Sequence, residues 1–196
     1  MAPRARLRKS RLSLALCFGL GILPDARAAV PLTKARIGAG PSIIQTPQKN
    51  IQTWGSFGTF RLGSYQERLQ IISGLDLTAW RLQDQPKDGL NYDIHGNDVL
   101  FFIGYAAGSW TLWGGLGAGQ IRVYDREAPD EDKPHRSINQ VTEAGGSYDL
   151  YRAQFAKIDA SFTWRHMTPE KGWRSAYAMN MIDCIQFEVG FKLLGW

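Results

Sequence analysis

The feature that most constrains this chain is the regular alternation of apolar and polar residues near its C-terminus. In residues 185–193, Ile, Phe, Val, Phe and Leu occupy the odd positions, and Gln, Glu, Gly and Lys occupy the even positions. Residues 158–165 show the same period, with Phe162 and Trp164 on the apolar side. Successive side chains of a β-strand point to opposite faces, so this pattern predicts two strands, each with one apolar and one polar face.

Six other segments alternate less regularly, while helical periodicity is poor throughout the chain. In chain order these strand candidates are residues 35–44, 54–65, 69–79, 99–105, 110–124 and 138–151. The glycines of residues 110–124 are typical of a strand that bends closely past a neighbour. Eight candidates therefore predict an all-β protein, and the sequence leaves open whether residues 29–50 form a first strand or a tail.

The first 28 residues have the order of a secretory signal peptide. A basic start with five Lys and Arg residues precedes an apolar run over residues 12–23, and the small-residue pattern Ala26-Arg27-Ala28 follows. The apolar run is too short for a helix that spans a bilayer. We therefore predict a signal peptide over 1–28, removed after export through the inner membrane, and one β-barrel domain over 29–196.

Removal of this leader changes what the charge of the chain implies. Residues 1–28 hold six of the 23 Lys and Arg residues and one of the 18 Asp and Glu residues, so residues 29–196 carry 17 of each. The formal charge of +5 therefore gives no reason to expect a nucleic-acid partner. Cys184 is the one cysteine after residue 28, which excludes an intramolecular disulfide.

Strands of this kind suit either a soluble lipocalin-like barrel or an outer-membrane barrel. A soluble barrel turns its apolar faces inward, whereas a membrane barrel turns them toward lipid. The signal peptide, strand candidates of about ten residues or more, and 14 Trp and Tyr residues in the chain favour the membrane alternative. We therefore predict a small antiparallel transmembrane β-barrel of eight strands, located in the bacterial outer membrane.

The predicted connections alternate between long and short, as in outer-membrane barrels with long extracellular loops and short periplasmic turns. The sequence predicts long polar loops over residues 83–98 and 125–137, and short connections near residues 66–68, 107–109 and 152–154. His95 and His135 are expected to be solvated loop residues, and the acidic run 130–132 to be a solvated loop tip. No metal site and no cofactor are predicted.

Three polar residues share the apolar stripes of the last two strands. His166 and Thr168 follow Trp164 on the same face of one strand, and Asp183 precedes Ile185 on the next. With both chain ends periplasmic, all three stand at the outer rim of the barrel and face lipid. Ionisable groups in such positions are costly and indicate function. A hydroxyl on Thr168, a base on His166 and an orienting carboxylate on Asp183 have the chemistry of an acyl-transfer triad.

The segments "RHMTP" (165–169) and "IDCIQFEVGFKL" (182–193) resemble the last two strands of PagL-type outer-membrane lipid A 3-O-deacylases. These eight-stranded barrels end the penultimate strand in a His-x-Ser-Asn motif and begin the last strand with a Glu. The resemblance implies that His166 is the base, Thr168 the nucleophile and Asp183 the orienting acid. Thr168 replaces the family's Ser, and Pro169 replaces the Asn that stabilises the oxyanion. Asn180 could replace that Asn if its loop folds back.

Two functions follow as alternatives. The first is an ester hydrolase that removes an acyl chain from lipid A or a related outer-leaflet lipid. The second is a catalytically inactive outer-membrane barrel with a structural or surface-binding role. A pore is disfavoured because eight strands leave a lumen that side chains fill. The sequence leaves open whether the chain forms a homodimer.

Overall fold

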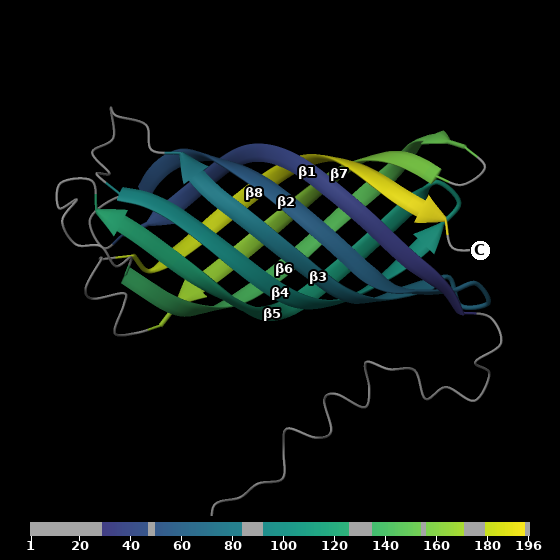
Figure 1. Cartoon of the computed structure of the whole chain (residues 1–196), viewed down its shortest axis with the longest axis horizontal. Coiled ribbons are helices and arrows are strands. Elements are labelled where there is room, and N and C mark those ends of the chain that lie inside the picture. The colour runs from purple at the N-terminus through teal and green to yellow at the C-terminus, as the bar shows by residue number, and fades with distance from the viewer. Residues whose placement is uncertain are drawn as a thin grey trace, which may run out of the picture.

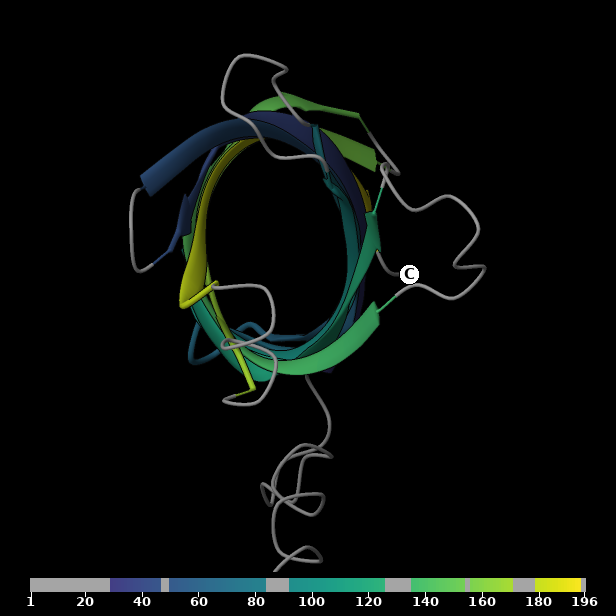
Figure 2. The ribbon, with the colours of Figure 1, turned by 90° about the vertical axis from the view of Figure 1, so that its left-hand side faces the viewer.

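Eight antiparallel strands close into a single barrel. The computed structural model describes residues 29–46, 50–83, 92–125, 135–153, 156–170 and 179–194. The strands are β1 (Ala29–Gln45), β2 (Asn50–Gln66), β3 (Ile71–Gln83), β4 (Tyr92–Ala107), β5 (Trp110–Asp125), β6 (His135–Arg152), β7 (Ala156–Pro169) and β8 (Met181–Leu194). Each strand pairs with the next in the chain, and β8 pairs with β1 (Figure 1). The end-on view in Figure 2 shows the resulting ring. The prediction of an all-β, eight-stranded antiparallel transmembrane barrel is confirmed.

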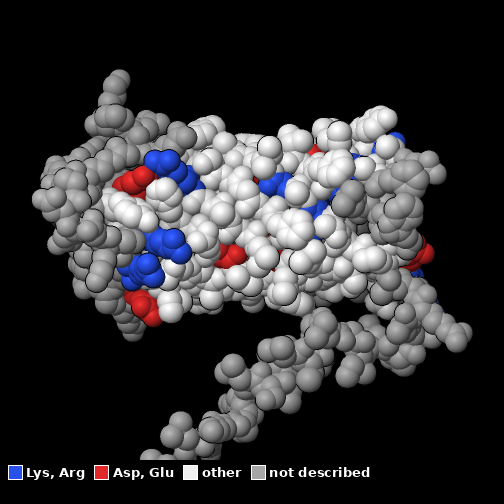
Figure 3. Space-filling view, in the orientation of Figure 1, with Lys and Arg blue, Asp and Glu red and all other residues white. Residues whose placement is uncertain are grey.

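The apolar stripes of the sequence lie on the outside of this ring. Along β7, buried and exposed residues alternate from Lys157 to Trp164, with the polar residues inward. Phe162 of β7 and Phe187 of β8 are 47% and 59% exposed, and their rings contact each other across the strands. Over the middle of the barrel in Figure 3 the surface is mostly uncharged. An apolar outer wall with a polar interior is the arrangement of a membrane barrel, because lipid replaces water as the outer solvent.

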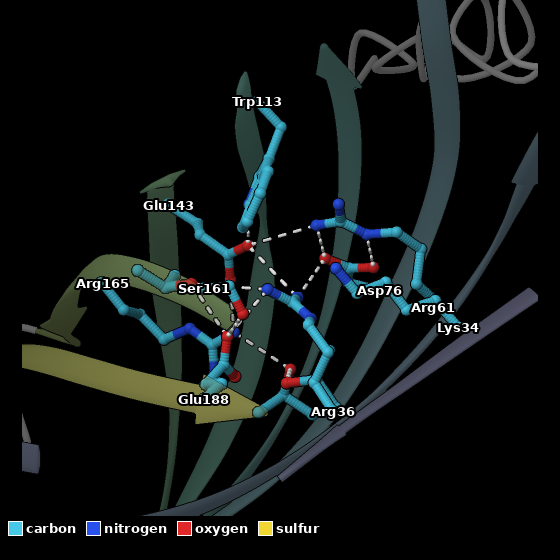
Figure 4. A network of polar contacts seen from close by, with 12 residues as sticks. Lys34, Arg36, Arg61, Asp76, Trp113, Glu143, Ser161, Arg165 and Glu188 are labelled. Atoms are coloured by element: carbon cyan, nitrogen blue, oxygen red, sulfur yellow. Dashed lines mark hydrogen bonds and ion pairs between the residues drawn. The ribbon is translucent and has the colours of Figure 1, made fainter. Parts of the chain in front are cut away.

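Paired charges fill much of the interior. The described residues include five buried basic and five buried acidic side chains: Lys34, Arg36, Arg61, Lys157 and Arg165, and Asp76, Asp98, Glu143, Asp159 and Glu188. Figure 4 shows the part of this network around Arg36, Glu143 and Glu188. Arg36 donates to Asp76 at 3.0 Å and to Glu188 at 2.9 Å, and Arg165 donates to Glu143. The balance of charge avoids unpaired buried ions, and an interior so occupied argues against a pore.

The two ends of the barrel differ in their connections. At one end, β2 and β3 are joined by residues 67–70, and β4 and β5 by residues 108–109. These turns use the left-handed conformation at Gln70 (φ 54°) and Gly108 (φ 60°). The first described strand begins and the last one ends at this same end (Figure 1). Short turns mark the periplasmic end of outer-membrane barrels, so the opposite end, with the longer connections, is the outer rim.

Three expectations from the sequence need correction or completion. Residues 29–45 form a strand, β1, rather than a tail. The predicted loop over residues 83–98 is too long, because β4 begins at Tyr92 and contains His95. The predicted loop over 125–137 is too long as well, because β6 begins at His135.

These polar strand ends extend beyond the apolar part of the wall, so hydropathy did not reveal them.

The predicted signal peptide (1–28) and the acidic run 130–132 lie outside the described residues. Among the residues that the structure describes, no helix has the length and apolar character needed to span a membrane.

Candidate active site

The hairpin of β7 and β8 brings His166, Thr168 and Asp183 together at the outer rim. The alternation on β7 turns His166 and Thr168 outward, between the buried side chains of Arg165, Met167 and Pro169. In the register of the pair, His166 lies directly opposite Asp183. Residues opposite each other on antiparallel strands have Cβ atoms about 4.5–5.5 Å apart, which suits a direct side-chain contact.

The three side chains form a continuous hydrogen-bonded chain. Nδ1 of His166 lies 2.8 Å from Oδ1 of Asp183, and Nε2 of His166 lies 3.1 Å from Oγ1 of Thr168. An ionised carboxylate can only accept, so Nδ1 of a neutral imidazole donates to Asp183. Nε2 then has a free lone pair and accepts from the Thr168 hydroxyl. This is the arrangement of a nucleophile, a general base and an orienting acid.

The site is partly shielded by its neighbours and open on the lipid side. The side chains of His166 and Asp183 are 28% and 22% exposed. The ring of Trp164 stacks near the imidazole, with ring centroids 5.9 Å apart and planes 27° apart. Ile43 of β1 lies opposite Asp183 on its other side. Aromatic and aliphatic neighbours limit access of water to the pair, while a substrate lying along the wall can reach Thr168.

The motif at residues 165–169 does not supply a hydrogen-bond donor for the oxyanion. Pro169 has no backbone N–H and is buried. Asn180 donates its backbone N–H to the carbonyl of Gln45 at the end of β1, 2.8 Å away. Because β8 lies between β1 and β7, this contact ties Asn180 to the side of β8 away from Thr168. The suggestion that Asn180 folds back to the nucleophile is therefore not supported.

Gln140 of β6 is a residue that the sequence did not reveal. It lies directly opposite Thr168 in the register of β6 and β7 and is exposed on the outer wall. Its side-chain amide carries two N–H donors on a flexible stem, at the strand spacing that allows cross-strand side-chain contacts. The alternation of residues 138–142 could place Gln140 on the outer face, but only the strand register places it opposite Thr168.

Elsewhere in the described ranges, no group of three His, Cys, Asp or Glu residues is placed to hold a metal ion. Cys184 is buried and free. His95, expected in a loop, lies on the outer side of β4 with Nε2 3.0 Å from Oδ2 of Asp93.

The sequence matches no protein-family model and no curated protein. Among solved structures, the fold is similar to Neisserial surface protein A, with a TM-score of 0.54, 11% identity, and coverage of 86% of this chain and 99% of that one. It is also similar to Ail, the attachment invasion locus protein of Yersinia pestis, with a TM-score of 0.51, 14% identity, and coverage of 84% and 97%. A further structure of Ail, in complex with the heparin analogue sucrose octasulfate, gives a TM-score of 0.50 at 13% identity, with coverage of 84% and 98%. The chain therefore has the fold of the small outer-membrane β-barrels.

Proposed function

We propose that this chain is an outer-membrane ester hydrolase that removes an acyl chain from lipid A or a related outer-leaflet lipid. The observation that carries the proposal is the hydrogen-bonded order Asp183, His166, Thr168 on the lipid-facing side of the outer rim. A polar trio in this place is costly unless it is used. Acyl esters of outer-leaflet lipids lie at the depth of such a rim, and the PagL-type deacylases provide the precedent for this chemistry on such a barrel.

In the first half of the reaction, Oγ1 of Thr168 attacks the carbonyl carbon of the ester while Nε2 of His166 takes the hydroxyl proton. Asp183 stabilises the imidazolium that forms. The tetrahedral intermediate collapses, the lipid alkoxy group leaves with the proton from His166, and the acyl group stays on Thr168. In the second half, His166 deprotonates a water molecule that attacks the acyl ester. A fatty acid leaves, and the proton returns to Thr168.

Gln140 is the proposed donor to the oxyanion in both halves. It replaces in space the donor that Pro169 has removed from the motif. One oxyanion donor is worth about a hundred- to a thousandfold in rate, so the site needs such a group to be effective. The methyl group of Thr168 crowds the attack, and this enzyme is therefore expected to be slower than one with Ser at the same position.

The test is made in cells whose outer membrane contains fully acylated lipid A. Expression of the chain is expected to lower the mass of lipid A by one acyl chain, measured by mass spectrometry, and expression of His166→Ala is expected to leave it unchanged. Folding of both proteins is checked by the shift in gel mobility on heating. An unchanged lipid A spectrum with folded wild-type protein contradicts lipid A as the substrate.

The second candidate is an inactive barrel with a surface-binding role. Pro169 in the place of an oxyanion donor favours it, as does the similarity to Ail, which was solved with a sulfated sugar analogue. In that case His166 and Thr168 hydrogen-bond headgroups without chemistry. Wild-type and His166→Ala proteins would then give the same lipid spectra with every ester tested.

A further inference from the structure

A row of basic side chains crosses the outer wall away from the triad. Arg81 of β3 lies opposite His95 of β4, His95 lies opposite Arg122 of β5, and Arg122 lies opposite Arg136 of β6. We call these four residues the basic row. The neighbours of these residues whose burial is described face inward and are buried, so all four side chains point outward. Neighbouring strands lie about 4.8 Å apart, so the long side chains of adjacent members of the row can contact one ligand, whereas Arg81 and Arg136 point to different sides of the ring.

The charges of this row are not balanced by the described residues around it. Asp93 pairs with Arg81 at 2.8 Å and with His95 at 3.0 Å. Within the described ranges, Arg122 donates only to the amide oxygen of Gln120, at 3.1 Å, and Arg136 has no ion pair. Like charges directly opposite each other destabilise a sheet. Arg122 and Arg136 therefore present two adjacent cationic groups, to which an anion can bind.

Next to the basic row, the wall is hollowed. A groove of about 420 Å³, here called the outer groove, lies over β2 to β5 and is edged by Arg81 and Arg122. Small outward residues form its surface: Ser56, Gly58, Ala79 and Asn97. A Cβ atom placed on Gly58 would meet nothing within 4 Å, so the space beside it is open. In Figure 3, Lys and Arg side chains gather toward the loop-bearing end of the barrel.

The wall changes in regular steps along these strands. Two residues along the strands from the basic row, toward the middle of the barrel, the next outward-facing pair is Ala79 opposite Asn97. The outward-facing pair after that is Leu77 opposite Val99. Leu77 and Val99 are exposed, 43% and 52%, and belong to the apolar wall. Basic, small polar and apolar layers in this order match the phosphate, sugar and acyl layers of a lipid in the outer leaflet.

We propose that the basic row and the outer groove bind a phosphate-bearing glycolipid of the outer leaflet at a second site, separate from the triad. The phosphate lies at Arg122, where the groove meets the basic row, with Arg136 on the next strand. The sugar lies in the groove over Ala79 and Asn97, and the acyl chains follow the apolar wall below. A soluble phosphorylated or sulfated sugar has the same anionic chemistry but lacks acyl chains for that wall. The continuity of the groove with exposed Leu77 and Val99 is what favours the lipid.

The experiment uses the folded full chain in mild detergent and native mass spectrometry. Binding is measured for diphosphorylated lipid A, for the same glycolipid without phosphate, and for inositol hexakisphosphate as a soluble polyanion. The double variant Arg122→Gln/Arg136→Gln is expected to bind the phosphorylated lipid about ten- to thirtyfold more weakly, as for two cations near an anionic surface. Gly58→Leu, which fills the groove without changing charge, is expected to weaken binding at least about threefold, since it displaces the sugar.

Arg152→Gln is the matched control, because Arg152 is an exposed Arg on β6 at the other end of the barrel. It is expected to bind as the wild type does. Binding by the double variant is also compared in proteins that carry His166→Ala and do not hydrolyse the lipid, so loss of hydrolysis and loss of this site are separate results. Equal binding by wild type and double variant, equal binding of the dephosphorylated glycolipid, or binding of the soluble polyanion alone each overturns the proposal.

Discussion

Replacement of Asp183 by Asn tests the catalytic geometry most quantitatively. Asn has nearly the same shape as Asp, so the barrel and the stacking of Trp164 on His166 remain. The change removes the negative charge beside the imidazolium. It also offers an N–H donor to Nδ1 of His166, which favours the tautomer that protonates Nε2 and prevents it from accepting the Thr168 proton.

The magnitude follows from the contact between the two side chains. With Nδ1 and Oδ1 2.8 Å apart, the charge centres are about 4 Å apart, and at an effective dielectric constant of about 20 their attraction is about 4 kcal/mol. The two side chains are 28% and 22% exposed, and the resulting solvent screening reduces this value toward about 2 kcal/mol. A loss of about 2–4 kcal/mol in the transition state lowers kcat by about 30- to 1000-fold.

The assay is acyl release from lipid A in mixed micelles, with kcat and KM determined separately. Asp183 acts on the imidazolium of the transition state, so kcat falls while KM stays nearly constant. Asp183→Glu keeps the charge but lengthens the side chain, and is expected to retain more activity than Asp183→Asn. A kcat for folded Asp183→Asn within twofold of the wild-type value refutes the triad.

Three further predictions concern the nucleophile, the oxyanion and the barrel interior. Thr168→Ser removes the crowding methyl group and is expected to raise kcat severalfold in the same assay; a fall of tenfold or more would contradict the nucleophilic role. Gln140→Ala is expected to lower kcat about a hundredfold or more, whereas Arg152→Gln, an exposed change on β6 at the other end of the barrel, is not; equal rates for both variants would remove Gln140 from the site. Glu143 accepts from Trp113 at 2.7 Å and pairs with Arg165. Glu143→Gln therefore leaves buried positive charge uncompensated and is expected to lower the free energy of unfolding in urea by about 3–5 kcal/mol. A loss below about 1 kcal/mol would show that the network tolerates the imbalance.

The sequence predicts which face of the strands carries His166, Thr168 and Asp183, because successive residues of a strand alternate between the two faces. Once β7 and β8 are recognised from their apolar stripes, the parity of residues 166, 168 and 183 places all three on the outer wall. Their position at the rim follows from the direction of the two strands. The hydrogen bonds require in addition that His166 be opposite Asp183, which depends on the register of the hairpin.

The oxyanion candidate and the basic row could not be predicted in the same way. Gln140 and the members of the basic row become neighbours only through the registers of strands that are separated by polar connections, and a change of register would pair other residues. The first residues of β4, from Tyr92, are as polar as a loop. Composition alone therefore predicted that His95 lies in a loop. In β1, Pro31 and Pro41 weaken the strand pattern, because proline cannot donate a hydrogen bond to a neighbouring strand. Pro41 lies where pairing of β1 with β8 is interrupted, between Ala39 and Ser42.

The most direct measurement of the central claim is the covalent capture of the nucleophile. Wild-type protein in outer-membrane vesicles is treated with a long-chain alkyl fluorophosphonate, and the modified residue is located by peptide mass spectrometry. The adduct is expected on Thr168 in the wild type and at least a hundredfold less in His166→Ala. Folded wild-type protein without an adduct on Thr168, or with equal labelling in both proteins, would contradict the hydrolase.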